Sequence, residues 1–60
     1  MVEITFICRG GESIGTFDSP QVPPKGARIQ INGTAYIVRE VNWYFGAVIS
    51  AEITVSRRRN

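Results

Sequence analysis

The segment of residues 34–43 loses its alternation of apolar and polar side chains halfway along, and this constrains the fold more than any other feature. Tyr36 and Val38 lie on one face of an extended chain. The next bulky apolar residues, Val41 and Trp43, would lie on the opposite face if the alternation continued. A strand with one continuous buried face therefore requires a local change of phase.

A β-bulge at Arg39-Glu40 supplies that change, because two residues of the bulged strand then face one residue of its partner. The shift places all four apolar side chains, including Trp43, on the same face. It also bends the strand and increases its twist. We therefore predict a small sheet that curls over on itself, with Trp43 in its core.

The rest of the chain contains the alternation and turn signals of a small all-β domain. Asn32-Gly33 predicts a two-residue type I′ hairpin turn, since both residues tolerate positive φ. The stretch 18–26 holds all three prolines and predicts a surface loop, because proline donates no backbone hydrogen bond. Strands are expected over Val2–Arg9, Ile14–Phe17, Arg28–Ile31, Thr34–Trp43 and Ala47–Val55. The predicted fold is a strongly bent antiparallel sheet, or a partly open SH3-like barrel, of four or five strands.

The length predicts one domain over residues 1–56 and a basic tail over residues 57–60. A 60-residue chain buries only about 60% of the surface that its unfolded form exposes, so we expect self-association to help cover the core. Cys8 falls on the inward face of the first strand and has no second cysteine to pair with. No signal peptide or membrane-spanning run is visible, so we expect a cytoplasmic protein.

The formal net charge of +2 conceals an uneven distribution along the chain. Without the arginines of the tail, residues 57–59, the chain carries four basic and five acidic residues, a balance of 4 − 5 = −1. This balance argues against a barrel coated with positive charge, as binding to a nucleic-acid backbone requires basic groups clustered on one face. The tail is interpreted either as a phosphate-binding element or as a solubilising chain end.

One motif extends over residues 22–43 of the chain. Its residues are Val22, Pro23, Gly26, Gly33, Tyr36, Val38, Val41 and Trp43. They form the pattern Val-Pro-x-x-Gly, a strand, a tight glycine turn, Tyr-x-Val, two residues and Val-x-Trp. This pattern resembles that of short SH3-like β-barrel accessory proteins of phage and bacterial genomes. The resemblance implies the small-barrel fold and a phage or prophage setting, and it carries over no site residues. Those proteins often place acidic residues and glycines after the tryptophan, where this chain has Tyr44-Phe45-Gly46.

The composition argues against catalysis. The chain contains no histidine, so neither a Ser-His-Asp nor a Cys-His system can be assembled, and Cys8 has no base to deprotonate it. A buried core thiol is the simpler interpretation of Cys8. We expect no cofactor and no bound metal.

The aromatic residues Tyr44 and Phe45 are the most informative surface candidates. They could form a binding surface, since exposed aromatics contribute large rigid contact areas, or they could fold back and plug the end of the barrel.

These observations predict a non-enzymatic binding module that acts as a homo-oligomer and sequesters or inhibits a partner. The partner is expected to be a host protein or a small anionic ligand, such as a nucleotide, with no membrane involved. The alternatives are a nucleic-acid-binding barrel and a structural virion or scaffold component. The candidate binding residues are Tyr44, Phe45, Arg28, Arg39, Arg57 and Arg58.

Overall fold

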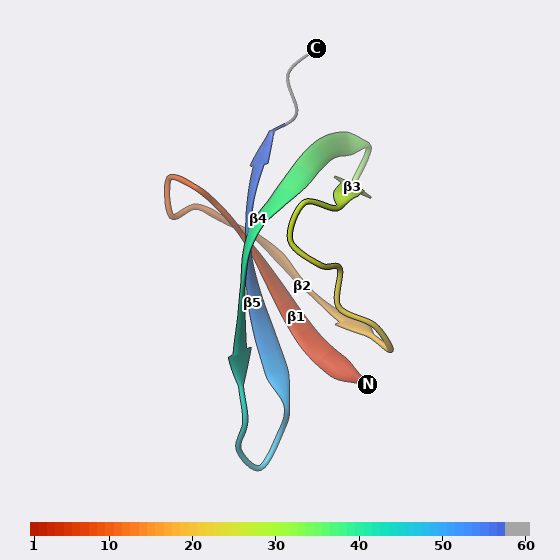
Figure 1. Ribbon diagram of the computed structural model, residues 1–60, viewed down its shortest axis with the longest axis vertical. Coiled ribbons are helices and arrows are strands. Elements are labelled where there is room, and N and C mark those ends of the chain that lie inside the picture. The colour runs from red at the N-terminus through yellow and green to blue at the C-terminus, as the bar shows by residue number, and fades with distance from the viewer. Residues whose placement is uncertain (58–60) are drawn as a thin grey trace.

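A computed structural model describes residues 1–57 of the chain, and these residues form a single five-stranded sheet without helices (Figure 1). The strands are β1 Val2–Cys8, β2 Ser13–Ser19, β3 Arg28–Ile31, β4 Thr34–Tyr44 and β5 Ser50–Arg57. Their order across the sheet is β2-β1-β5-β4-β3, and the sheet curls into a half-barrel. The predicted small, partly open all-β barrel is confirmed. Arg57, assigned to the tail from the sequence, is the last residue of β5.

One strand pairing differs from the expectation of an entirely antiparallel sheet. β1 pairs in parallel with β5, whereas the β1–β2, β3–β4 and β4–β5 pairs are antiparallel. β5 is therefore the central strand, with β1 on one side and β4 on the other. Because β2 and β3 pair on one side only, the barrel stays open between them.

The predicted bulge in β4 is confirmed by the pairing register. Val38 lies opposite Val55, and the next paired position on β4 is Glu40, opposite Thr54. Arg39 is therefore the extra residue. A second irregularity, not anticipated from the sequence, lies in β2, where Ile14 is passed over between two paired residues.

The predicted hairpin turn and proline loop are also present. Asn32 and Gly33 both adopt positive φ, 50° and 84°, as a type I′ turn requires. The proline-rich segment after β2 contains no strand, and its end is anchored to β4 by two backbone bonds. Gly26 donates its N–H to the carbonyl of Val38 at 2.8 Å, and Val38 donates to the carbonyl of Ala27 at 2.9 Å.

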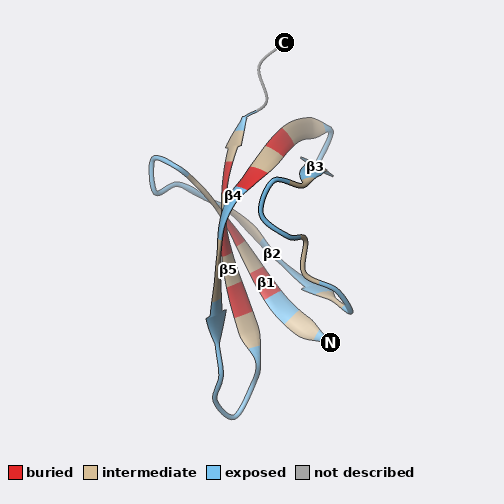
Figure 2. Ribbon diagram, in the orientation of Figure 1, coloured by how far each residue is buried: buried red, intermediate tan, exposed pale blue. Residues whose placement is uncertain are grey.

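The core lies on the concave face of the half-barrel, where alternate residues of the central strands are buried (Figure 2). Its buried residues are Ile4, Phe6, Ile31, Tyr36, Val38, Ala51, Ile53 and Val55. No polar or charged residue is buried among the described part of the chain. Cys8 is partly buried and packs against this core, on the side expected from the alternation.

Two expectations about the β4–β5 end of the sheet are wrong. Trp43 lies opposite the buried Ala51, so the bulge does place it on the core face. However, 45% of Trp43 is exposed, because the half-barrel does not extend over this end of the ribbon. Ile49, expected inside a strand, lies in the loop before β5 and is 44% exposed.

Candidate functional site

The hairpin between β4 and β5 projects from the sheet (Figure 1), and five apolar side chains in and beside it are exposed. We call them the hydrophobic end: Trp43, Tyr44, Phe45, Val48 and Ile49. Tyr44 is 52% exposed and Phe45 is 76% exposed. The interpretation of Phe45 as a plug of the barrel is therefore wrong, and both aromatic residues lie on the surface.

The hairpin projects because the neighbouring strands stop short of it. β1 reaches β5 only as far as the pair Glu3 and Ser50, with one further contact from the Glu3 N–H to the carbonyl of Ile49 at 3.5 Å. The β4–β5 pairing itself ends at Tyr44 opposite Ser50. Beyond that point the loop has no partner strand among the described residues, and its apolar side chains are left without cover.

Two aromatic rings give this end a fixed shape. The rings of Trp43 and Phe45 are stacked, with centroids 6.0 Å apart and planes 12° from parallel. Side chains two residues apart share a face of the strand, which brings the rings together. The stacked pair presents a rigid aromatic surface whose ordering costs little side-chain entropy on binding.

The outer edge of β4 is free along the stretch that leads to the hydrophobic end. Among residues 1–57, β3 pairs with β4 only from Thr34 to Ile37, and the proline loop bonds to the next residue, Val38. Beyond Val38, this edge of β4 has no backbone partner among the described residues. Backbone groups alternate in direction along an antiparallel ladder. After the one-residue shift of the bulge, Val41 and Trp43 therefore direct their N–H and C=O groups outward, as Val38 does.

A cleft of about 480 Å³ lies between this free edge and the proline loop. Its lining consists of Val22, Pro23, Pro24, Lys25, Arg39, Glu40, Val41 and Trp43. Five of these eight residues are apolar, and the three charged ones are Lys25, Arg39 and Glu40. The Nε of Arg39 donates to Ser56 Oγ at 2.7 Å across the sheet. The lining is therefore mainly apolar along the exposed backbone of β4.

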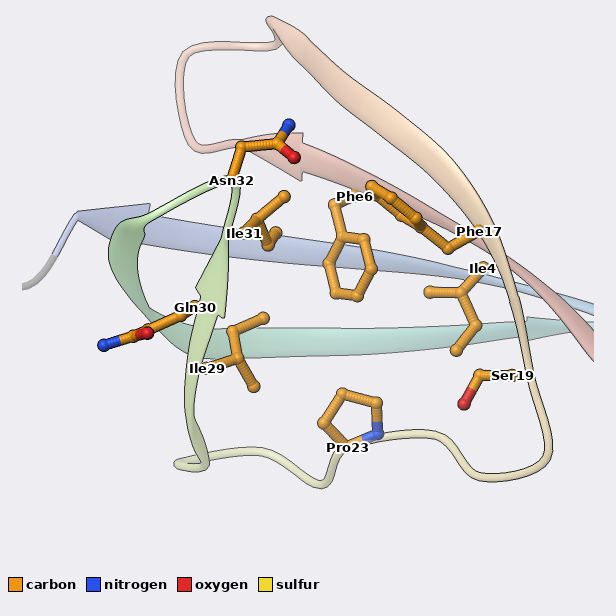
Figure 3. Close-up of a pocket in the computed structure, with 9 residues that line it drawn as sticks. All are labelled: Ile4, Phe6, Phe17, Ser19, Pro23, Ile29, Gln30, Ile31 and Asn32. Atoms are coloured by element: carbon orange, nitrogen blue, oxygen red, sulfur yellow. The ribbon is translucent and has the colours of Figure 1, made fainter.

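A second cavity, of about 340 Å³, marks the seam where the barrel does not close (Figure 3). Its lining consists of Ile4, Phe6, Phe17, Ser19, Pro23, Ile29, Gln30, Ile31 and Asn32. Phe6 lies at its centre, with Ile29 and Ile31 on the β3 side and Phe17 on the β2 side. Phe17 meets Phe6 edge to face at 5.8 Å. The cavity has the volume and lining of a site for one apolar group.

The structure separates Arg28 and Arg57 from the aromatic candidates, whereas Arg39 lines the cleft that Trp43 also lines. Arg28 lies opposite Ile37 on β4, which is seven residues from Tyr44, or about 23 Å along the strand. A single small ligand cannot bridge Arg28 and Tyr44 over that distance. Arg57 ends β5, near the Arg28 end of the sheet, and Arg58 lies outside the described residues.

One basic residue that the sequence did not single out belongs with Arg28 and Arg39. Arg9 follows β1 directly, and its N–H bonds to the carbonyl of Val55 at 3.0 Å, which places it beside Ser56. No pattern in the sequence pointed to Arg9, because its position depends on the parallel pairing of β1 with β5, which alternation alone does not reveal.

Among residues 1–57, no three or more Cys, Asp or Glu side chains gather as a metal ion would require. The same residues include no helix long and apolar enough to cross a membrane. No protein-family model, curated protein or solved structure matches the chain.

Proposed function

We propose that this chain is a non-enzymatic binding module that holds a protein partner at its hydrophobic end. The observation that carries the proposal is the exposure of five apolar side chains in a stretch without a single charge between Trp43 and Ala51. Charged groups are depleted at the centres of protein interfaces, where tryptophan, tyrosine and phenylalanine are enriched.

The size of the hydrophobic end supports a protein as the partner. Its five side chains, weighted by their exposed fractions, present on the order of 500 Å² of surface in total. This surface includes both faces of the hairpin, because Tyr44 alternates with the stacked Trp43 and Phe45. A partner that contacts both faces and contributes an equal area would bury about 1,000 Å² in total, which is the lower limit for a specific interface.

The free edge of β4 defines the kind of protein segment that fits. Val41 and Trp43 offer outward N–H and C=O groups beside a mainly apolar cleft. An extended segment of the partner would add to β4 as a further strand, and its alternate apolar side chains would contact the proline loop and Trp43.

The proposal also includes self-association: when no partner is present, two copies of the chain associate through the hydrophobic end and the free edge of β4. Two hydrophobic ends carry no charges that repel each other, and an antiparallel pair of β4 edges is self-complementary about a two-fold axis. A partner then acts by competing for this end. The proposal also includes a cytoplasmic setting and a phage-type accessory role, which rest on the unpaired Cys8 and on the resemblance of residues 22–43.

Tyr44→Ala/Phe45→Ala tests the proposal, with Phe17→Ala as the control because it removes an exposed aromatic ring elsewhere. Native mass spectrometry measures the oligomeric mass, and affinity capture from a bacterial lysate measures retained proteins. The double variant is expected to be monomeric and to lose the proteins that the wild type and Phe17→Ala retain. Unchanged mass and unchanged capture in the double variant would refute the proposal.

A second pair of variants tests the edge of β4. Val41→Pro removes an outward N–H without removing a bond to β5, and Val41→Ala is the control for the lost side chain. Association should weaken more in Val41→Pro than in Val41→Ala. Equal effects would contradict strand addition.

A further inference from the structure

The outer face of the sheet carries three arginines in one line across four strands, far from the hydrophobic end. Arg28 on β3 lies opposite Ile37 on β4, and Ile37 lies opposite Ser56 on β5. Arg9, at the end of β1, lies beside Ser56 on the other side. Neighbouring strands are about 4.8 Å apart, so the line spans about 14 Å.

Arg39 occupies the middle of this line. As the extra residue of the bulge, it is released from the regular alternation, and its Nε donates to Ser56 Oγ at 2.7 Å. The bond holds the side chain over β5 and uses one of the five N–H groups of the guanidinium. We call Arg9, Arg39 and Arg28 the arginine row.

Two acidic residues, Glu3 and Asp18, lie at the other end of the same face. Glu3 lies opposite Asp18 and beside Ser50, six residues from Ser56 along β5, or about 20 Å. That separation is more than twice the Debye length of about 8 Å at physiological ionic strength. The carboxylates of Glu3 and Asp18 therefore do not cancel the potential of the arginine row.

Three acidic residues lie nearer to the arginine row than Glu3 does, and the row still carries an excess of positive charge. Glu52 is four residues from Ser56 along β5, or about 13 Å. Glu12 is in the turn after Arg9. Glu40 follows Arg39, and its Oε1 accepts a hydrogen bond at 3.1 Å from Asn42 Nδ2, further along β4 toward the hydrophobic end. With Arg57 at the end of β5, this end of the described sheet carries four arginines and two glutamates.

We propose that the arginine row binds the phosphate backbone of a nucleic acid. Guanidinium groups bind phosphate oxygens in a bidentate manner, and six of the seven basic residues of this chain are arginines. A line about 14 Å long is wider than one phosphate group can contact, so a linear polyanion fits better than a small anion. Arg39 also lines the cleft of the proposed function, whereas Arg9 and Arg28 do not, and oligonucleotide binding is measured separately from association of the chain.

The test is the fluorescence anisotropy of labelled oligonucleotides, single-stranded and duplex, titrated with the full chain at increasing salt. Three phosphate contacts contribute a slope of about −2.7 in log K against log salt for duplex, and about −2.1 for a single strand. The factor that these three contacts contribute to the binding constant falls about 40-fold for duplex between 50 and 200 mM salt, and about 20-fold for a single strand. The two substrates show which form is bound.

Arg9→Gln/Arg28→Gln/Arg39→Gln should reduce the slope by about 2 to 3 and weaken binding at least tenfold near 100 mM salt. A second variant adds Glu3→Gln, Asp18→Asn and Glu52→Gln at the acidic end, which restores the formal charge to 2 − 3 + 3 = +2. Binding should stay weak in this variant if the row is the site. Circular dichroism checks that both variants fold.

Three results would overturn the assignment. One is restored binding in the charge-matched variant, since net charge rather than the row would then govern affinity. Another is an unchanged slope in the triple glutamine variant. The third is equal affinity for polyglutamate of matched length, which would show that any polyanion suffices. Tyr44→Ala/Phe45→Ala should bind oligonucleotide as the wild type does.

Discussion

Ile53 and Ile49 form a matched pair that tests where the core of this protein ends. Alternation along residues 47–55 places both side chains on the same face, so the sequence alone predicts equal costs for their truncation. In the structure, Ile53 is 0% exposed and lies opposite Phe6 and Val41, whereas Ile49 is 44% exposed in the hairpin loop. The two substitutions should therefore have different effects on stability.

The magnitudes follow from burial. Ile53→Ala removes a fully buried side chain from the central strand and should cost about 3–4 kcal/mol in the free energy of unfolding. Full burial of an isoleucine contributes about 1.5–3 kcal/mol, so the half-exposed Ile49 should cost about 1 kcal/mol when changed to alanine. A 60-residue domain has a total stability of only about 3–9 kcal/mol, so Ile53→Ala removes a large part of it.

Urea denaturation followed by far-ultraviolet circular dichroism measures both costs. With a slope near 1 kcal/mol/M, the midpoint of Ile53→Ala should fall by about 3 M and that of Ile49→Ala by about 1 M. If Ile53→Ala is unfolded without urea, Ile53→Val, with an expected cost of about 1 kcal/mol, replaces it and is compared with Ile49→Val. Equal costs within either pair would show that the core continues into the hairpin, and the hydrophobic end would then not exist.

Two further predictions concern the turn and the tryptophan. Gly33→Ala should lower the free energy of unfolding by about 1 kcal/mol in urea denaturation, because Gly33 has a φ of 84°. The control is Gly10→Ala, at a position with open space and no positive φ, which should cost less. Equal costs would argue against the type I′ turn. Trp43 is the only tryptophan, and acrylamide should quench its fluorescence readily in the folded chain; protection as strong as that of a buried indole would contradict its exposure.

Local pattern was sufficient for most of the secondary structure. The φ preferences of Asn32-Gly33 and the exclusion of proline from central strands are properties of individual residues, and both act in the same way in any tertiary setting. The bulge was visible for a similar reason. A change of phase between Val38 and Val41 is written in the order of the residues, and a bulge is the local structure that resolves it.

The extent of cover over the sheet was not visible in the sequence. Alternation reports which face a side chain takes, and it placed Trp43 correctly on the core face. It does not report whether another segment lies above that face. Trp43 and Ile49 are exposed because β1 ends before it reaches the hairpin, and this depends on the lengths and pairing of distant strands.

What the sequence determined by itself was therefore the set of strands, their turns and the point where β4 bends, because these follow from neighbouring residues. Only the tertiary structure decided where the charges meet. Counted along the chain, the body has a balance of −1, yet the parallel pairing of β1 with β5 brings Arg9 alongside Arg28 and Arg39 and leaves Glu3 about 20 Å away. Electrostatic potential depends on distances in space, and those are fixed by which strands become neighbours.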